Sequence, residues 1–132
     1  MTDQIIQKML EKATAAMKNA YCPYSHFSVG ACVLADDGNL YAGCNVENVV
    51  YNATHAEVAA VAAMISAGAK RVQKIVIVAD CNKIIVPCGG CRQHLREFSS
   101  EDMEVYMFNN QGDCDMMKMG DLLVKSFGPE YL

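Results

Sequence analysis

The sequence has no apolar run long enough to cross a bilayer, so we expect no helical membrane span. It also has no excess of basic residues, because 11 Lys and Arg stand against 15 Asp and Glu and give a formal net charge of −4. Without a cationic field, the chain is a poor partner for the phosphates of a nucleic acid polymer. This balance remains compatible with a small, neutral substrate.

The N-terminus lacks the pattern of a secretory signal, since MTDQIIQKMLEK carries acids and amides where such a signal has basic residues followed by a continuous apolar stretch. The seven cysteines are odd in number, whereas a secreted disulfide framework normally pairs them. We therefore expect a reducing, cytoplasmic location without membrane association. At 132 residues, 52% of them apolar, the chain has the length and composition of one globular domain over residues 1–132.

The order of predicted elements indicates a layered α/β fold. Apolar residues recur at helical spacing over residues 2–20, where Thr2 and Asp3 are candidate caps. Residues 27–35 and 40–45 flank a turn and predict a hairpin. The remaining predicted elements are a helix capped by Thr54 and ending near Ser66, a strand over 74–79 buried on both faces, a helix from about Cys88 to Phe98, a strand over 104–108, a turn over 109–112 and a short helix near Leu122. This order predicts a three-layer α/β/α domain with a mixed sheet of about five strands.

Two short motifs carry the strongest chemical signal: H-A-E at residues 55–57 and P-C-G-G-C at residues 87–91. Two thiolates and one imidazole suit Zn²⁺, and three protein ligands leave the fourth tetrahedral position to water, as in catalytic rather than structural sites. At a helix N-terminus the dipole and the free N–H groups favour the thiolate form that binds metal. The motifs therefore predict one Zn²⁺ ion per subunit, held by His55, Cys88 and Cys91.

Glu57 is better suited to acid–base chemistry than to metal binding, because residues two apart on a helix do not share a face with each other. A carboxylate beside zinc-bound water can take its proton and later deliver protons to a ring nitrogen and to a departing amine. The combination of H-x-E with P-C-x-x-C is also the signature of zinc-dependent nucleobase deaminases. We therefore predict a hydrolytic deaminase in which Glu57 is catalytic.

Two other interpretations of the C-x-x-C pair remain open at this stage. A non-catalytic structural zinc site would need a fourth ligand, for example Cys81 or Cys114. A redox protein would instead carry a reducible disulfide between Cys88 and Cys91, and it would leave the H-x-E motif unexplained.

Nearly the whole chain resembles the small, homotetrameric cytidine deaminases. The resemblance rests on residues 24–31 (YSHFSVGA), 43–48 (GCNVEN), 55–57 (HAE) and 87–93 (PCGGCRQ). It implies the cytidine deaminase-like fold, a homotetramer with sites near subunit interfaces, and deamination of cytidine or deoxycytidine in pyrimidine salvage, with release of ammonia. A deaminase of modified or antibiotic cytosine nucleosides is the nearest alternative.

The resemblance also implies how a nucleoside is held. Phe27 packs against the pyrimidine, while Asn45 and Glu47 bind the ribose 3′-hydroxyl. An amide and a carboxylate can donate and accept around a hydroxyl, which gives a discrimination that an apolar wall cannot provide. Without the resemblance, N-V-E-N would be interpreted as an ordinary polar loop.

Three further residues are assigned to substrate binding by the resemblance. The backbone of Ala56 faces the base, and Tyr51 matches an aromatic that follows N-V-E-N in this family. Phe127 corresponds to an aromatic that reaches the site of a neighbouring subunit, with ordinary core packing as the alternative interpretation.

The chain departs from the family pattern near the metal site. His55 stands where small tetrameric members commonly have Cys, and Val58 stands where they have Arg. Three thiolates leave a net negative site that a guanidinium can offset, whereas one imidazole and two thiolates balance Zn²⁺ without it. The segment between Asn45 and His55 is also one residue shorter than the family pattern, which predicts an altered tolerance for substituents on the base.

Overall fold

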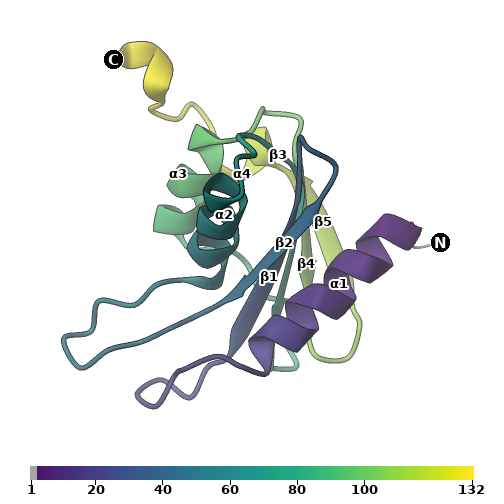
Figure 1. Ribbon diagram of the computed structural model, residues 1–132, viewed down its shortest axis with the longest axis vertical. Helices are drawn as coiled ribbons and strands as arrows, with labels where there is room; N and C mark the ends of the chain where they lie inside the picture. Colours follow the sequence, from purple (N-terminus) through teal and green to yellow (C-terminus); the bar gives the residue numbers. More distant parts are fainter. Residues whose placement is uncertain (1–2) are drawn as a thin grey trace.

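A computed structural model describes residues 3–132 as a five-stranded mixed sheet between layers of helices (Figure 1). The strands are β1 (Val29–Ala35), β2 (Leu40–Cys44), β3 (Val72–Ala79), β4 (Glu104–Phe108) and β5 (Cys114–Lys118), in the order β2-β1-β3-β4-β5. The helices are α1 (Gln4–Met17), α2 (Ala56–Ser66), α3 (Gly89–Glu97), α4 (Met119–Leu122) and the 3₁₀ turn η1 (Pro129–Tyr131). Helix α1 covers one face of the sheet, and α2 and α3 cover the other. The expected three-layer α/β/α architecture is confirmed.

The sheet separates two apolar cores. Side chains alternate across a strand, so that Ala31, Ile75 and Ile77 pack beneath α2 and α3, while Cys32 and Val76 pack beneath α1. Residues 75–79 are all buried, which explains the density of β-branched residues in this segment and confirms the strand that the sequence predicts there.

Helix α1 begins after Asp3, whose carboxylate accepts a hydrogen bond from the N–H of Ile5 at 3.1 Å. The other candidate cap, Thr2, lies outside the described residues. The apolar stripe that periodicity predicts is the buried face of the helix, made of Ile6, Met9, Ala13 and Met17. Within residues 3–132 no helix combines the length and the apolarity that a membrane span requires.

The predicted cap of α2 is wrong. His55, and not Thr54, occupies the N-cap position. Thr54 instead exchanges two backbone hydrogen bonds with Val46, at 2.8 and 2.9 Å, in an isolated antiparallel bridge beyond β2. The consequence is that His55 stands at the very start of the helix.

Strand β5 is the element that the sequence did not locate, although about five strands were expected. It pairs antiparallel with β4 after the predicted turn at 109–112. Its residues, C-D-M-M-K, include no β-branched side chain, and four of the five are exposed at the edge of the sheet. Neither apolar alternation nor β-propensity could therefore reveal it.

The strand directions bring the starts of α2 and α3 together. Strand β1 is antiparallel to both β2 and β3, and β3 is parallel to β4, so β2, β3 and β4 all run in the same direction. Helix α2 connects β2 to β3, and α3 connects β3 to β4 on the same face (Figure 1). A helix that links parallel strands begins at the end where the first strand finishes. Both helix N-termini therefore lie at one end of the sheet.

Strand β2 packs very closely on α2 at Gly43. A Cβ atom at this position would lie 2.6 Å from the Cβ of Ala59 and 2.6 Å from the backbone nitrogen of Ala60. Only glycine permits this approach, which brings the end of β2, and Asn45 just beyond it, close to the helix.

We expect Gly43→Ala to lower the free energy of unfolding by about 1–3 kcal/mol, because the added methyl group forces β2 and α2 apart. Chemical denaturation of the zinc-loaded protein measures the change. Gly90→Ala is the matched control, since its Cβ would meet nothing within 4 Å. Equal stability of Gly43→Ala and the unsubstituted protein would show that the close contact is unimportant.

Candidate metal centre and active site

Three potential metal ligands come from the starts of α2 and α3. His55 and Cys88 are the N-cap residues of these helices, and Cys91 lies in the first turn of α3. The Sγ atom of Cys88 accepts a hydrogen bond from the N–H of Cys91 at 3.4 Å. The free N–H groups and the dipole at this end of α3 stabilise negative charge on sulfur.

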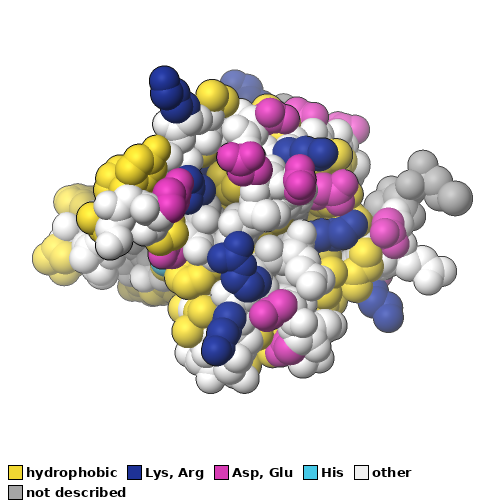
Figure 2. Space-filling model, turned by 90° about the horizontal axis from the view of Figure 1, so that it is seen from above, with side chains coloured by type: hydrophobic (Ala, Val, Ile, Leu, Met, Phe, Trp, Pro, Cys, Tyr) yellow, Lys and Arg dark blue, Asp and Glu magenta, His cyan; other side chains and the backbone are white. Residues whose placement is uncertain are grey.

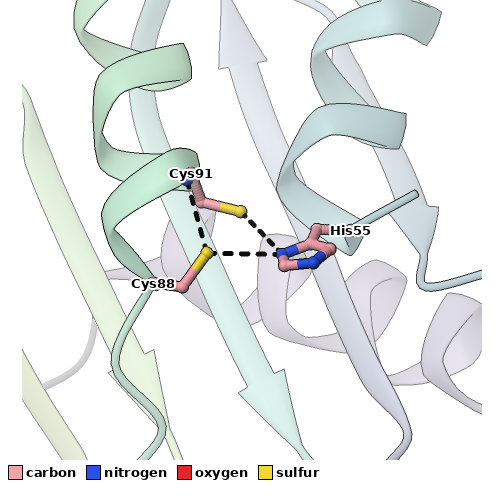
Figure 3. Close-up of side chains that lie close together, drawn as sticks. All are labelled: His55, Cys88 and Cys91. Carbon is pink, nitrogen blue, oxygen red and sulfur yellow. Dashed lines mark hydrogen bonds between the residues drawn. The ribbon is translucent and has the colours of Figure 1, made fainter. Parts of the chain in front are cut away.

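The three side chains converge on a common point (Figure 3). The Nδ1 atom of His55 lies 3.2 Å from the Sγ of Cys91 and 3.4 Å from the Sγ of Cys88. All three ligand atoms lie within 4.8 Å of one another, and this is the one group of at least three such residues found in residues 3–132. One imidazole nitrogen and two sulfurs at this separation are a donor set that suits Zn²⁺.

Glu57 lies in the first turn of α2, next to this set. Its side chain is 5% exposed, and it is the only charged residue among the buried residues of the described chain. Burial raises the pKa of its carboxyl group, which the Glu57 backbone N–H, the charge of His55 and the neighbouring Cys91 only partly oppose. A proton therefore binds to Glu57 more readily than to an exposed carboxylate.

The thiol of Cys91 also has a raised pKa, first because it is buried and then because it lies close to Glu57. Burial pushes both acids toward their protonated forms, and the charge of Glu57 adds to this effect for Cys91. A bound cation has the opposite effect, since a divalent metal deprotonates the thiols that coordinate it. The acidic groups of the site thus fit a metal ion electrostatically as well as geometrically.

A cavity of about 350 Å³ opens beside Glu57, a volume typical of a small-molecule site. Apolar side chains make up most of its wall, with a few polar groups among them. The lining residues are Ser25, Phe27, Val29, Asn45, Glu47, Ala53, His55, Ala56, Glu57, Ile85, Val86 and Cys88.

Four of the six residues that the sequence assigned to the substrate line this cavity: Phe27, Asn45, Glu47 and Ala56. The other two do not line it within a single chain. Tyr51 is 83% exposed and lies against Tyr24, while Phe127 is 58% exposed and stacks on Tyr131.

Asn45 is buried, and its side chain holds the backbone of residues 27–29, where the chain enters β1. Its Oδ1 accepts from the N–H of Val29 at 2.9 Å, and its Nδ2 donates to the carbonyl of Phe27 at 2.7 Å. An amide has two N–H groups and two acceptor positions on oxygen, so each end keeps one further hydrogen-bonding position.

The cavity wall also contains two apolar residues that the sequence did not predict, Ile85 and Val86. They belong to the irregular segment between β3 and α3, directly before Pro87, where the sequence predicts neither a helix nor a strand. Their position just ahead of the C-x-x-C motif was the available signal. No periodicity marks such residues, because an irregular segment has none.

The alternative interpretations of the cysteines lack support in the described chain. Cys81 and Cys114 are not part of the ligand group, and their thiols donate to the carbonyls of Lys83 and Asp115. Cys88 and Cys91 are both free thiols. The set therefore keeps only three protein ligands, which leaves one coordination position available for chemistry.

Comparisons with known proteins agree with this geometry. Residues 3–107 match the family model described as the cytidine and deoxycytidylate deaminase zinc-binding region. The chain is 39% identical over 128 residues to the cytidine deaminase of Sporosarcina psychrophila, covering 96% of this chain and 94% of that protein. It is 41% identical over 121 residues to the cytidine deaminase of Mycobacterium tuberculosis, covering 91% and 87%.

Solved structures show the same likeness. The crystal structure of the Burkholderia pseudomallei cytidine deaminase has a TM-score of 0.88 and 38% identity, covering 96% of this chain and 100% of that chain. The Mycobacterium tuberculosis structure has a TM-score of 0.83 and 38% identity, covering 96% and 99%.

We expect Cys91→Ser to lower the zinc content from about one ion per chain to a small fraction, because it removes a thiolate from a three-ligand site. Elemental analysis of zinc-loaded, gel-filtered protein measures this. Cys81→Ser is the matched control and should retain its zinc. Equal loss of zinc from both variants would mean that the ligand set is different from the one that the structure brings together.

Proposed function

This chain belongs to the cytidine and deoxycytidylate deaminase family, and we propose that it hydrolyses cytidine and deoxycytidine to uridine and deoxyuridine, with release of ammonia. One observation carries the proposal: a convergent set of three metal ligands lies beside a buried carboxylate on the wall of a small-molecule cavity. A structural zinc site would require neither the carboxylate nor the cavity.

In this proposal His55, Cys88 and Cys91 hold one Zn²⁺ ion per subunit. The bound ion supplies Lewis-acid activation of water at near-neutral pH. The chain contributes the orientation of the ligands, because two N-cap positions and one residue of a first helical turn are fixed by the packing of α2 and α3 on the sheet.

Glu57 is the proposed proton carrier. Its carboxylate accepts a proton from the attacking water and donates it to ring nitrogen N3 as the water oxygen bonds to C4. It then passes the second water proton to the amino group, which leaves as ammonia while C4 keeps the oxygen. Burial, which raises the pKa of Glu57, suits a group that must both accept and donate a proton in one cycle.

The substrate contacts are proposed from the residues that line the cavity. Phe27 packs against the pyrimidine, and the backbone of Ala56 faces the polar edge of the base. Asn45 and Glu47 bind the 3′-hydroxyl of the sugar, and Asn45 uses the hydrogen-bonding positions that its contacts with residues 27 and 29 leave available.

We also propose a homotetramer, in which Tyr51 and Phe127 complete the sites of neighbouring subunits. The loop before α2 and the C-terminal segment both extend away from the sheet in Figure 1. Val49, Val50 and Tyr51 of this loop are 73%, 74% and 83% exposed, and such clusters of exposed apolar side chains are typical of interfaces. Phe127 belongs to the C-terminal segment.

The proposed partner is a free nucleoside and not a nucleic acid polymer. Figure 2 shows Lys and Arg side chains interspersed with Asp and Glu side chains over one face of the molecule, in line with the net charge of −4. A strand-binding surface needs a continuous positive groove. We place the enzyme in the cytoplasm, in pyrimidine salvage, with residues 1–132 as one catalytic domain.

We expect Glu57→Gln to lower kcat for cytidine by roughly 10²–10⁴-fold while zinc remains bound, because the amide cannot carry the proton. Ammonia release and zinc content are measured on the same preparation. Undiminished activity in this variant would overturn the role of Glu57.

We expect Val58→Arg to lower kcat/KM by roughly tenfold, equivalent to about 1.4 kcal/mol. Val58 borders the same surface hollow as His55, Cys88 and Cys91, so a guanidinium there would add positive charge to a set that already balances Zn²⁺. Val58→Leu is the control for side-chain bulk. Unchanged turnover in Val58→Arg would contradict the charge-balance argument.

A further inference from the structure

The carboxylate of Glu47 is held by the segment that precedes β1. Its Oε1 accepts hydrogen bonds from the backbone N–H groups of Tyr24 and Ser25, at 3.1 and 3.2 Å. Its Oε2 accepts from the hydroxyl of Ser25 at 2.5 Å, which is a short distance typical of a hydroxyl bonded to an ionised carboxylate.

The hydroxyl of Ser25 has a second partner, because its Oγ accepts the N–H of Phe27 at 3.1 Å. A hydroxyl has only one proton to donate, and here it is donated to Glu47. Ser25 therefore connects the residue proposed to hold the sugar with the residue proposed to pack against the base. His26, between them, has a φ of +58°, an uncommon conformation for a side chain other than glycine, and its N–H donates to the carbonyl of Cys22 at 2.9 Å.

The number of acceptor positions limits what Glu47 can still bind. A carboxylate accepts about four hydrogen bonds, two on each oxygen. Both positions on Oε1 and one on Oε2 are occupied by donors from residues 24 and 25, so one position on Oε2 remains. Ser25 and Glu47 both line the cavity, so this position can serve a ligand bound there.

We propose that Ser25 is a positioning residue: its hydroxyl sets the rotation of the Glu47 carboxylate so that one acceptor position is presented to a single sugar hydroxyl, the 3′-hydroxyl of the nucleoside. The inference rests on the proposed function and deepens it. The single open acceptor position limits Glu47 to one donor from the ligand.

The electrostatics of the carboxylate agree with this role. The Ser25 hydroxyl is the largest cause of a pKa for Glu47 below its ordinary value, and the N–H groups of residues 24 and 25 act in the same direction. Glu47 is thus ionised and can only accept, which suits a sugar hydroxyl that donates.

The test compares two substrates that differ only in the 3′-hydroxyl, 2′-deoxycytidine and 2′,3′-dideoxycytidine. We expect Ser25→Ala to lower kcat/KM for deoxycytidine by roughly tenfold, mainly through KM, because it weakens a hydrogen bond present in both the bound and the transition state. With dideoxycytidine the loss should be less than about twofold, since no 3′-hydroxyl is there to be bound. Ser28→Ala is the matched control, because its hydroxyl contacts the thiol of Cys22 and not Glu47.

Two further variants separate positioning from folding. Ser25→Cys keeps the size of the side chain but offers only a weak donor, so it should show the same substrate-dependent loss even if Ser25→Ala folds poorly. In a Glu47→Gln background, Ser25→Ala should cause little additional loss with deoxycytidine, because Ser25 acts through Glu47.

The outcomes distinguish the two levels of the proposal. If the unsubstituted protein is active but the Ser25 variants lose equal activity on both substrates, or lose none, then only the role proposed for Ser25 is wrong. If the unsubstituted protein releases ammonia from neither nucleoside, then the proposed function is wrong, and so is the proposed binding of the sugar hydroxyl by Glu47.

Discussion

The site depends on one constraint of topology: two crossover helices start at the same end of the sheet. Because β2, β3 and β4 are parallel, α2 and α3 must both begin there and on the same face. His55 and Cys88 are the cap residues of these helices, and Cys91 follows within one turn. No long side chain or mobile loop has to reach across the molecule, so the ligand geometry is as rigid as the packing of the two helices on the sheet.

The same arrangement buries two acidic groups, which ionise with difficulty when no metal ion is bound. Burial raises the pKa of both Glu57 and Cys91, and the nearby Glu57 raises the pKa of Cys91 further. In the proposed function a divalent cation deprotonates the thiol, and Glu57 beside it is the acid–base group. We propose that one imidazole in place of a third thiolate balances the charge of the ligand set, so that Val58 can be apolar. The burial that raises both pKa values thus favours a bound cation and, in this proposal, a carboxylate that carries a proton.

The sequence predicted the parts of the fold and the site that are encoded locally. Helical periodicity predicted α1, the β-branched run predicted β3, and two contiguous motifs contained the four central residues. The errors and omissions involve residues that carry no local pattern of their own. Thr54 pairs with Val46 and so does not cap α2, and β5, which has neither alternation nor β-branched residues, forms by pairing with the neighbouring strand β4. Likewise Ser25 meets Glu47 from 22 positions away, and no local pattern encodes that hydrogen bond.

The convergence of His55, Cys88 and Cys91 implies that zinc has three protein ligands and one position open for chemistry. X-ray absorption at the zinc edge of the zinc-loaded protein measures this ligand set. We expect two sulfur neighbours at about 2.3 Å and two lighter neighbours at about 2.0–2.1 Å, one imidazole nitrogen and one exchangeable oxygen. A third sulfur, or a second imidazole in the place of the oxygen, would mean a closed structural site and would contradict it.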